Sequence, residues 1–145
     1  MVSTNRAVID RFVTSLNERR FDDLVELLDA DVIQDWPQSG ETFRGRESIR
    51  AVLDAFAELP ISEATRVVGS EDKWVLTPTW TPLQIVGTGD QYTIEAEIMY
   101  PNGDRWRYVG IARFRNGKIH RLTEYFAAPF PPAEWRSRWA EKVAP

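Results

Sequence analysis

Cysteine is absent from the 145 residues, and histidine occurs once, as His120. The lack of thiols excludes disulfides, cysteine nucleophiles, thiolate zinc sites and iron–sulfur clusters, and a single histidine excludes a multi-histidine metal site. Basic residues are not in excess either: 18 Lys and Arg stand against 22 Asp and Glu, for a net charge of −4. Nucleic-acid binding normally requires a basic surface. We therefore expect neither a metal nor a nucleic-acid partner.

Long apolar runs are also missing. No stretch approaches the roughly 18–20 residues that a membrane-spanning helix needs, and the first residues lack the apolar segment of a signal peptide. Glycine-rich phosphate loops, nucleotide-binding motifs and the Gly-x-Ser-x-Gly sequence of many hydrolases are absent too. We therefore expect a cytoplasmic protein that has no membrane partner and needs no cofactor.

Residues that form a core are plentiful. Hydrophobic residues make up 43% of the chain, and the aromatic residues are six Trp, four Tyr and seven Phe. A single domain of this length buries roughly two-thirds of its unfolded surface, so it can fold without disulfides or metals. The composition therefore indicates one globular domain that can accommodate a small-molecule site.

Helical periodicity is confined to the first half of the chain. Apolar residues recur at helical spacing from Ile9 to Leu16, after a cap at Ser3 or Thr4. A short helix is expected after Asp22, and a third helix ends at Pro60. This order of helices followed by antiparallel strands predicts an α+β fold. The expected strands are 31–36, 65–68, one that begins at 73–76, 91–100, 105–115 and 118–126, before a terminal helix at 133–142. The strand that begins at 73–76 is interrupted by Pro78 and Pro82, so we expect it to be an edge strand or a bulged strand.

Three short motifs occur in an order found in one protein family. They are Phe-Arg-Gly-Arg-Glu-Ser-Ile at 43–49, Ala-Arg-Phe-Arg-Asn-Gly-Lys-Ile at 112–119 and Glu-Tyr-Phe at 124–126. Their order and spacing resemble the SnoaL-like proteins of the nuclear transport factor two-like superfamily. The resemblance implies a cone-shaped α+β barrel, with three N-terminal helices on a curved, mostly antiparallel sheet. It implies a single domain over 1–145, with a core of about 5–130 and a C-terminal extension of about 131–145 that carries a short helix.

The same resemblance offers several functions. The superfamily includes ketosteroid isomerase, limonene epoxide hydrolase, polyketide cyclases and scytalone dehydratase, and also non-catalytic binding proteins. It implies a small hydrophobic ligand in an aromatic-lined cavity, with cofactor-free acid–base chemistry of the isomerase, cyclase, dehydratase or hydrolase type. A non-catalytic ligand-binding protein or a dimeric assembly protein is the alternative, because a fold does not fix a function. A homodimer is expected.

The hairpin around Asn116-Gly117 decides which face each residue of the last two strands occupies. A two-residue turn pairs Arg115 with Lys118, whereas a three-residue loop ending in a left-handed Gly117 pairs Phe114 with Lys118. We expect the three-residue loop, because it separates the aromatic from the basic residues. One face then carries Trp106, Tyr108, Gly110, Ala112, Phe114, His120, Leu122, Glu124 and Phe126, and the other carries Arg105, Arg107, Arg113 and Arg121.

Asp35, Glu124 and His120 are the candidates for catalysis. The position of Asp35 resembles that of the catalytic aspartate of ketosteroid isomerase, and a carboxylate at the mouth of an apolar cone would have the raised pKa of a general base. Glu124 resembles one catalytic carboxylate of limonene epoxide hydrolase and is the second acid or base. His120 is the single residue of the type that most often serves as a general acid or base. The alternatives are an exposed strand end for Asp35, an arginine pair or a solvated strand end for Glu124, and a structural or exposed position for His120.

Both enzyme resemblances are incomplete. The tyrosine and the protonated aspartic acid that hold the oxyanion in ketosteroid isomerase correspond to Phe12 and Ala112, and neither can donate a hydrogen bond. The arginine–aspartate pair of limonene epoxide hydrolase is missing from the matching region, where Glu95 and Glu97 are expected on the outer face. Substitute donors could come from Tyr108, Tyr125, Trp80 and Trp106.

Aromatic and small residues on the predicted inner face are the candidates for ligand contact. A sheet lined by aromatic rings suits a flat apolar ligand, although aromatic residues more often form the core. Gly110 and Ala112 either leave room for a ligand or make space for a helix side chain. Phe130 and Trp135 are expected to fold the C-terminal tail back over the domain, where it caps the pocket or joins a dimer interface. The candidate ligand contacts are Phe12, Trp36, Phe56, Trp80, Ile98, Tyr100, Trp106, Tyr108, Gly110, Ala112, Leu122 and Phe126.

Overall fold

The computed structural model describes residues 4–57, 79–99 and 104–141, and the side chains of 56 and 57 are not described. Its order of elements is α1 (Thr4–Asn17), α2 (Phe21–Glu26), β1 (Leu28–Trp36), β2 (Glu41–Arg44), α3 (Arg46–Ala57), β3 (Thr79–Thr88), β4 (Gln91–Met99), β5 (Arg105–Arg115), β6 (Lys118–Ala127) and the 3-10 helix η1 (Glu134–Trp139). The predicted α+β fold is confirmed. The expected strands at 65–68 and 73–76, and the expected helix end at Pro60, lie outside the described residues.

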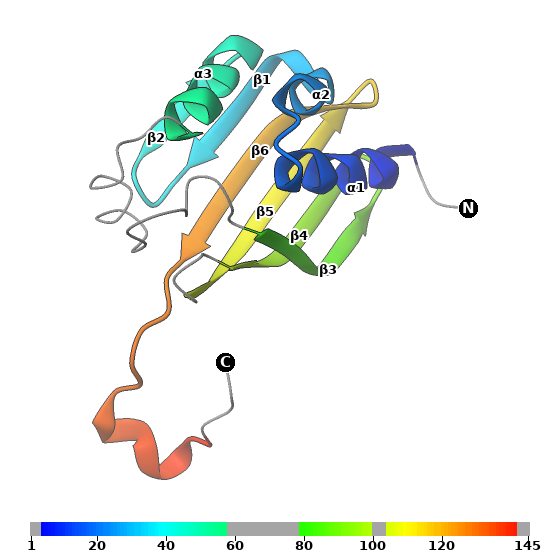
Figure 1. Ribbon diagram of the computed structural model, residues 1–145. Helices are drawn as coiled ribbons and strands as arrows, with labels where there is room; N and C mark the ends of the chain where they lie inside the picture. The colour runs from blue at the N-terminus through cyan, green and yellow to red at the C-terminus, as the bar shows by residue number, and fades with distance from the viewer. Residues whose placement is uncertain (1–3, 58–78, 100–103, 142–145) are drawn as a thin grey trace.

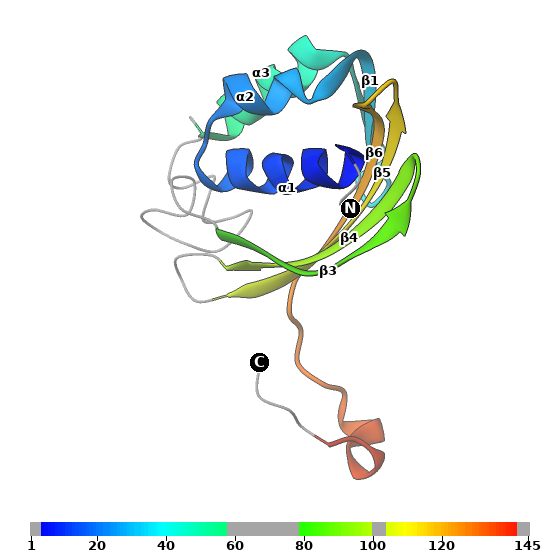
Figure 2. The ribbon, with the colours of Figure 1, turned by 90° about the vertical axis from the view of Figure 1, so that its right-hand side faces the viewer.

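The described strands form one six-stranded sheet. Its strands follow the order β2-β1-β6-β5-β4-β3, and β1 and β6 are parallel while the other neighbours are antiparallel. The sheet is curved, and the three α-helices lie on its concave side (Figures 1 and 2). We call this concave side the inner face and the opposite side the outer face. Pro82 lies in β3 at the sheet edge, as expected for a strand that contains proline.

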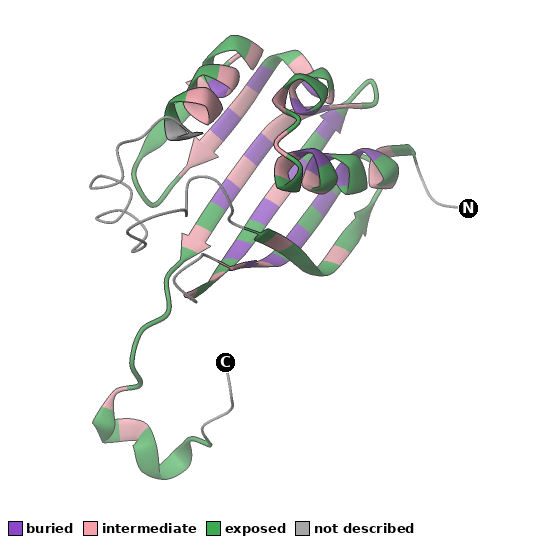
Figure 3. Cartoon of the chain, in the orientation of Figure 1, coloured by how far each residue is buried: buried purple, intermediate pink, exposed green. Residues whose placement is uncertain are grey.

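Side chains alternate between the two faces along each strand, and those on the inner face are buried. In β4 the buried residues are Tyr92, Ile94, Ala96 and Ile98, and every residue between them is more exposed. This alternation appears as bands of buried and exposed residues along the strands in Figure 3. The helix α1 brings Val8, Ile9 and Phe12 onto the inner face. Glu95 and Glu97 lie on the outer face as predicted, where Glu97 pairs with Arg107 at 2.7 Å. No helix among the described residues is long and apolar enough to cross a membrane.

The β5–β6 hairpin has a two-residue turn, so the expected three-residue loop is wrong. Arg115 pairs with Lys118, and both turn residues have positive φ, 52° at Asn116 and 76° at Gly117. Such a turn matches the right-handed twist of the two strands, and Asn-Gly is the dipeptide that adopts it most readily.

A bulge directly after the turn restores the predicted face for most of β6. Phe114 pairs with Ile119 and Arg113 pairs with Arg121, which leaves His120 as an extra residue. Ile119 and Leu122 are therefore both buried on the inner face. The predicted sharing of this face by Tyr108, Glu124 and the other residues from 106 to 126 is confirmed except for His120.

The C-terminal segment does not fold back over the domain, contrary to the prediction. After β6 the chain runs away from the sheet and ends in η1, a 3-10 helix and not an α-helix (Figures 1 and 2). Pro129, Pro131 and Pro132 fix the backbone of the connection in extended conformations, which explains why it does not turn back. Phe130 and Trp135 are exposed. We call residues 128–141 the arm.

Candidate functional site

A glutamate lies in the middle of the buried inner face. Glu124 comes from β6 and pairs across the sheet with Gly110 of β5. The structure leaves it 4% exposed. A carboxyl group is rarely buried without a cation, and among the described residues no basic side chain pairs with Glu124. The predicted arginine pair, offered as the alternative to a catalytic role, is thus not formed within that part of the chain.

Three neutral groups donate hydrogen bonds to the Glu124 carboxyl. Gln34 Nε2 and Trp36 Nε1 donate to Oε1 at 2.6 and 3.0 Å, and Tyr108 Oη donates to Oε2 at 2.5 Å. Gln34 and Trp36 are two residues apart on β1, so both side chains point to the inner face. Tyr108 projects from β5 on the other side of β6. The carboxyl group is therefore held from both neighbouring strands.

Burial and hydrogen bonding act in opposite directions on Glu124. Burial raises its pKa above the ordinary value of 4.5, and the bonds from Tyr108, Trp36 and Gln34 lower it by less, so the net shift is upward. Burial and the nearby Glu124 charge both raise the pKa of Tyr108 well above 10.0. The pair therefore holds its protons more strongly than the same groups in water.

Gly110 makes room for Tyr108 and not for a ligand or a helix side chain. A Cβ atom on Gly110 would lie 2.3 Å from Tyr108 Oη and 2.7 Å from its Cζ. The two residues are two apart on β5 and share its inner face, and the Tyr108 phenol occupies the space over Gly110 where it donates to Glu124. Both alternatives expected for Gly110 are therefore wrong.

Aromatic rings surround the carboxyl group. Trp80 packs edge-on against Tyr108, with ring centroids 4.5 Å apart, and Phe126 contacts Tyr108 at 5.4 Å and Trp36 at 5.8 Å. Trp36 also meets Phe43 at 4.8 Å. These edge-to-face contacts are favourable and orient the rings. We call Trp36, Phe43, Trp80, Tyr108 and Phe126 the aromatic cluster.

The Asn17 side chain ties β3 to the end of α1 at Trp80. Its Oδ1 accepts from Trp80 N, and its Nδ2 donates to Trp80 O, both at 2.8 Å. These two hydrogen bonds hold β3, an edge strand that has only β4 as its neighbour in the described sheet. Neither Asn17 nor Gln34 was identified from the sequence. Gln34 could have been, because it occupies a core position in the alternation of β1.

Asp35 lies on the outer face, so its predicted place at the cone mouth and its predicted raised pKa are wrong. Arg121 Nε donates to its Oδ2 at 2.7 Å, and Thr42 Oγ1 donates to its Oδ1 at 3.0 Å. The Arg121 hydrogen bond is the main reason that the pKa of Asp35 lies below its ordinary value of 3.8. The neighbouring residues Gln34 and Trp36 face inward, so Asp35 must face outward. Asp35 and Glu124 do not meet.

His120 lies in the bulge and away from Glu124, so its predicted place on the inner face is also wrong. It is close enough to Asp29 to contribute to the lowered pKa of that carboxyl, after the larger effects of the Asp31 backbone and Arg115. Its Nδ1 is buried and has no hydrogen-bond partner among the described residues.

The remaining predicted contact residues divide into two groups. Phe12, Ile98, Ala112 and Leu122 are buried in the core, and Trp106 packs against it. Tyr100 and the side chain of Phe56 lie outside the described residues.

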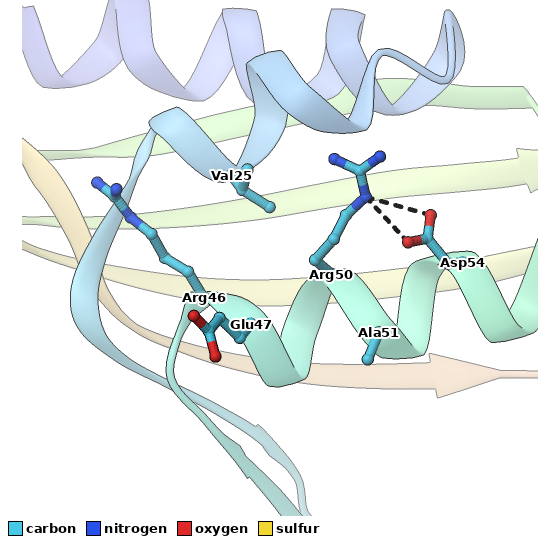
Figure 4. A pocket seen from close by; sticks show the side chains of 6 residues that line it. All are labelled: Val25, Arg46, Glu47, Arg50, Ala51 and Asp54. Atoms are coloured by element: carbon cyan, nitrogen blue, oxygen red, sulfur yellow. Dashed lines mark hydrogen bonds and ion pairs between the residues drawn. The ribbon is translucent and has the colours of Figure 1, made fainter.

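A separate groove lies between α2 and α3, with a volume of about 410 Å³ (Figure 4). Arg50 forms bonds of 3.1 Å to both carboxylate oxygens of Asp54 and also contacts Asp22, so its charge is already compensated. No residue of the aromatic cluster lines this groove. In the described part of the chain, no three Asp, Glu or His side chains are grouped as metal ligands would be.

Comparisons with known proteins agree with this fold. The model of the SnoaL-like domain family matches residues 9–122, while no curated protein matches the sequence. An NTF-2 like protein of unknown function from Burkholderia xenovorans LB400 is 29% identical, with a TM-score of 0.70 over 97% of this chain and 96% of that chain.

Two further solved structures share the fold at lower identity. A protein from Kribbella flavida DSM 17836, provisionally named a ketosteroid isomerase, is 19% identical, with a TM-score of 0.76 over 98% of this chain and 91% of that chain. TerC, co-crystallised with polyporic acid, is 19% identical, with a TM-score of 0.64 over 86% of this chain and 92% of that chain.

Proposed function

The chain belongs to the SnoaL-like domain family, and from that premise we propose that it binds a small, flat, hydrophobic molecule and transfers protons on it through Glu124 and Tyr108. The observation that carries the proposal is the Glu124 carboxyl group, buried and held by three neutral donors. Keeping such a group in a core costs folding free energy unless it is fully hydrogen-bonded. A core built only for stability has no need of it.

The hydrogen-bond pattern gives the pair two useful protonation states. When Glu124 is ionised, it accepts three bonds and is a base whose pKa is raised toward neutrality. When it takes up a proton on Oε2, Gln34 and Trp36 stay on Oε1 and the new O–H donates to Tyr108 Oη. The phenol proton is then free to turn to another acceptor.

This exchange suits a ligand that contains a carbonyl group. A proton leaves the carbon next to the carbonyl and arrives on Glu124, while the electron pair of the C–H bond moves to the carbonyl oxygen. The Tyr108 hydroxyl donates to that oxygen as its negative charge develops. In this proposal Glu124 is the base, and Tyr108 is the oxyanion donor in place of the donors that Phe12 and Ala112 cannot provide.

The aromatic cluster supports the choice of ligand class. Its rings offer apolar edges and faces beside the hydrogen-bonded polar groups of Gln34, Tyr108 and Glu124 on the inner face. The relative crystallised with polyporic acid shares the fold with this chain. We propose an aromatic or polycyclic carbonyl compound as the substrate class.

Two probes test binding and chemistry separately. We expect 2-naphthol, a flat phenol, to bind saturably with a change in its fluorescence, and Tyr108→Phe to weaken binding about tenfold, as the loss of one buried hydrogen bond predicts. We expect the protein to accelerate exchange of the 2-tetralone α-protons for deuterium in D₂O, followed by NMR, and Glu124→Gln to abolish the acceleration.

Matched controls exist on the outer face. Tyr125→Phe on β6 and Glu95→Gln on β4 make the same chemical changes at exposed positions, and both should behave as wild type. Loss of exchange activity in Glu95→Gln, or full activity in Glu124→Gln, would remove Glu124 from the chemistry. Absence of binding by either probe would overturn the ligand class.

A non-catalytic binding protein is the second candidate. It is favoured by the saturation of Glu124 with protein donors and by the outward orientation of Asp35. Binding of 2-naphthol without any exchange of 2-tetralone is its expected result. The homodimer and the cytoplasmic location expected from the sequence stay proposals.

A further inference from the structure

Two carboxamide side chains bind the backbones of two aromatic cluster residues in the same way. Asn17 Oδ1 accepts from Trp80 N, and Asn17 Nδ2 donates to Trp80 O, both at 2.8 Å. Gln38 Oε1 accepts from Phe126 N at 2.6 Å, and Gln38 Nε2 donates to Phe126 O at 2.8 Å. Each amide therefore meets the N–H and the C=O of a single residue, as a residue of a neighbouring strand does.

The two rings fixed in this way are both neighbours of the Tyr108 phenol. The Trp80 and Tyr108 ring centroids are 4.5 Å apart, and those of Phe126 and Tyr108 are 5.4 Å apart. Trp80 and Phe126 also meet each other, with centroids 6.2 Å apart. Tyr108 is 1% exposed, and its hydroxyl donates to Glu124. The position of that hydroxyl therefore depends on where the two neighbouring rings lie.

We infer that Asn17 and Gln38 are positioning residues for Tyr108. Each fixes the backbone of one ring neighbour, and the two neighbours together keep the phenol on the buried carboxyl group of Glu124. An oxyanion donor is effective only where its hydrogen is aimed before the reaction starts, and small misplacements of such groups are costly. The inference deepens the function proposed for Tyr108 and Glu124, and its binding test below rests on that proposed function.

Trp80 needs such a partner because of its place in the sheet. The strand β3 lies at the edge and pairs only with β4 in the described sheet. The N–H and C=O of one strand residue point to the same side, so those of Trp80, which meet Asn17, point away from β4. The register of β3 and β4 also shifts between Pro82 and Gln84, and proline has no N–H to donate. Asn17 therefore replaces a missing strand beside an irregular part of the sheet.

Phe126 needs a partner because β1 ends before it reaches this part of β6. Asp35 of β1 pairs with Thr123 of β6, and the same parallel register continued by three residues would place residue 38 beside Phe126. The strand β1 ends at Trp36 instead, and the chain turns toward β2. The side chain of Gln38 therefore bonds where the backbone of the same residue would lie in a longer strand.

The exposure of both amides separates positioning from stability. Asn17 and Gln38 are exposed, so neither fills the core, and water can replace the bonds of either one when it is lost. A strand end that loses these bonds is free to fray, because local opening costs least where contacts are few. We therefore expect alanine at either position to disturb the placement of the rings more than the free energy of unfolding.

Matched controls are available on the same elements. Asn5 also lies on α1, and its Nδ2 donates to Gly89 O at 2.8 Å and to Asp90 Oδ1 at 3.3 Å, at the other end of the β3–β4 hairpin. Asn5→Ala therefore removes comparable bonds between α1 and this hairpin, but none to an aromatic cluster residue. Gln91→Ala, at an exposed position of β4, is the control for Gln38→Ala.

NMR of the full chain, labelled with ¹³C at the tyrosine Cζ, tests the positioning without any ligand. The chemical shift of this carbon reports the hydrogen bond of the hydroxyl, and the Tyr108 signal is identified by its loss in Tyr108→Phe. We expect the signal to move toward the shift of tyrosine in water in Asn17→Ala and in Gln38→Ala. Asn5→Ala and Gln91→Ala should leave it at the wild-type position.

Binding of 2-naphthol gives a second readout that a merely structural role would not produce. We expect Asn17→Ala and Gln38→Ala each to weaken binding about threefold, less than the tenfold expected for Tyr108→Phe, because the hydroxyl is displaced and not removed. In the Tyr108→Phe background neither substitution should weaken binding further, since no hydroxyl is left to position. General loosening of the fold would instead weaken binding equally in both backgrounds.

A second pair of variants covers failure of the alanine variants to fold. Asn17→Asp and Gln38→Glu keep the acceptor oxygen and lose the donor, and we expect them to move the Tyr108 signal in the same direction.

Three results would overturn the inference. They are an unchanged Tyr108 signal in the variants at Asn17 and Gln38, an equal movement of that signal in Asn5→Ala, and equal losses of binding with and without the Tyr108 hydroxyl. A wild type that does not bind 2-naphthol, combined with the expected movement of the Tyr108 signal, would refute the proposed ligand class and still support the positioning roles.

Discussion

Two carboxyl groups on neighbouring strands of one sheet have opposite environments. Glu124 of β6 lies on the inner face among aromatic rings, and burial raises its pKa. Asp35 of β1 pairs in register with Thr123, the residue just before Glu124, but lies on the outer face, where Arg121 lowers its pKa. The two groups differ in the face of the sheet that they occupy more than in their position along it.

The face of the sheet on which a carboxyl group lies decides its hydrogen-bond partners and the direction of its pKa shift. A strand alternates its side chains, so adjacent residues enter media of different polarity. The outer carboxylate obtains an arginine and two hydroxyl donors, whereas the inner one obtains only neutral donors. The environment of Asp35 favours its ionised form, and the burial of Glu124 favours its protonated form.

Gly110→Ala is expected to have the largest effect on the environment of the Glu124 carboxyl group. The added methyl group would collide with the Tyr108 ring and hydroxyl, so the phenol must leave Glu124. We expect the free energy of unfolding to fall by about 3 kcal/mol, from overpacking and a lost hydrogen bond to a buried carboxyl. Urea denaturation measures it. Val109→Ala, one residue away on the exposed side, is the control, and an equal loss there would refute the assignment.

A smaller effect is expected from Tyr108→Phe, which removes one donor from Glu124 and leaves the ring in place. We expect a loss of about 2 kcal/mol, typical of a hydrogen bond to a charged or buried carboxyl group. Tyr125→Phe removes a hydroxyl from an exposed ring on the adjacent strand and should change stability by less than about 0.5 kcal/mol. Similar losses in the two variants would mean that the Tyr108–Glu124 bond adds nothing.

Opposite pH dependences sharpen the comparison further. The pKa of Glu124 is raised on folding, so its contribution to stability is complete below pH 4.5 and is lost as the pH rises through the folded value. The free energy of unfolding of Glu124→Gln should therefore improve relative to wild type as the pH rises above 4.5.

The Asp35 half of this prediction has the opposite sign. Its pKa is lowered, so its contribution is present above pH 3.8 and is lost as the pH falls through the folded value. Asp35→Asn should cost about 1 kcal/mol at pH 7, the upper end for a partly exposed ion pair, and nothing at the lowest pH. Denaturation measured from pH 3 to 8 checks both variants, and slopes of the same sign would contradict the contrast.

The smallest effect is expected for deletion of His120. This residue is the extra one in the β6 bulge, so its removal leaves Ile119 and Leu122 facing inward on a regular strand. We expect a loss of no more than about 1 kcal/mol, because no residue changes face. Deletion of Thr123 on the same strand would move Glu124 to the other face, and it should prevent folding. A tolerated Thr123 deletion would show that register is not what fixes Glu124.

Much of the fold could be predicted from the sequence because periodicity records burial directly. The alternation in 91–99 and 105–115 predicted which residues face the core, and the helical spacing from Ile9 to Leu16 predicted α1. The choice of hairpin was wrong, although the predicted faces were correct for the assigned residues other than His120. Asn-Gly favours the two-residue turn locally, and the alternation requires the bulge, but the sequence does not say where an extra residue is placed.

Only part of the candidate site could be predicted from the sequence. Glu124 and Tyr108 were identified as inner-face residues, yet Asp35 was given priority over Glu124 by analogy of position. Its actual face depends on the register of β1 beside β6, which are 86 residues apart in the sequence at the Asp35–Arg121 contact. Gln34, the true inner neighbour, carries no catalytic signal of its own.

The sequence by itself determined the α+β class, the alternating faces of β4 and β5, the edge position of the proline-containing strand and the exclusion of thiol chemistry, since each follows from local composition or period. The tertiary structure decided the partners of Glu124, the outward orientation of Asp35, the use of the space over Gly110 and the direction of the arm. These depend on contacts between strands that are far apart in the chain, and a hydrogen bond or a clash between such residues exists only once the sheet has fixed their distance.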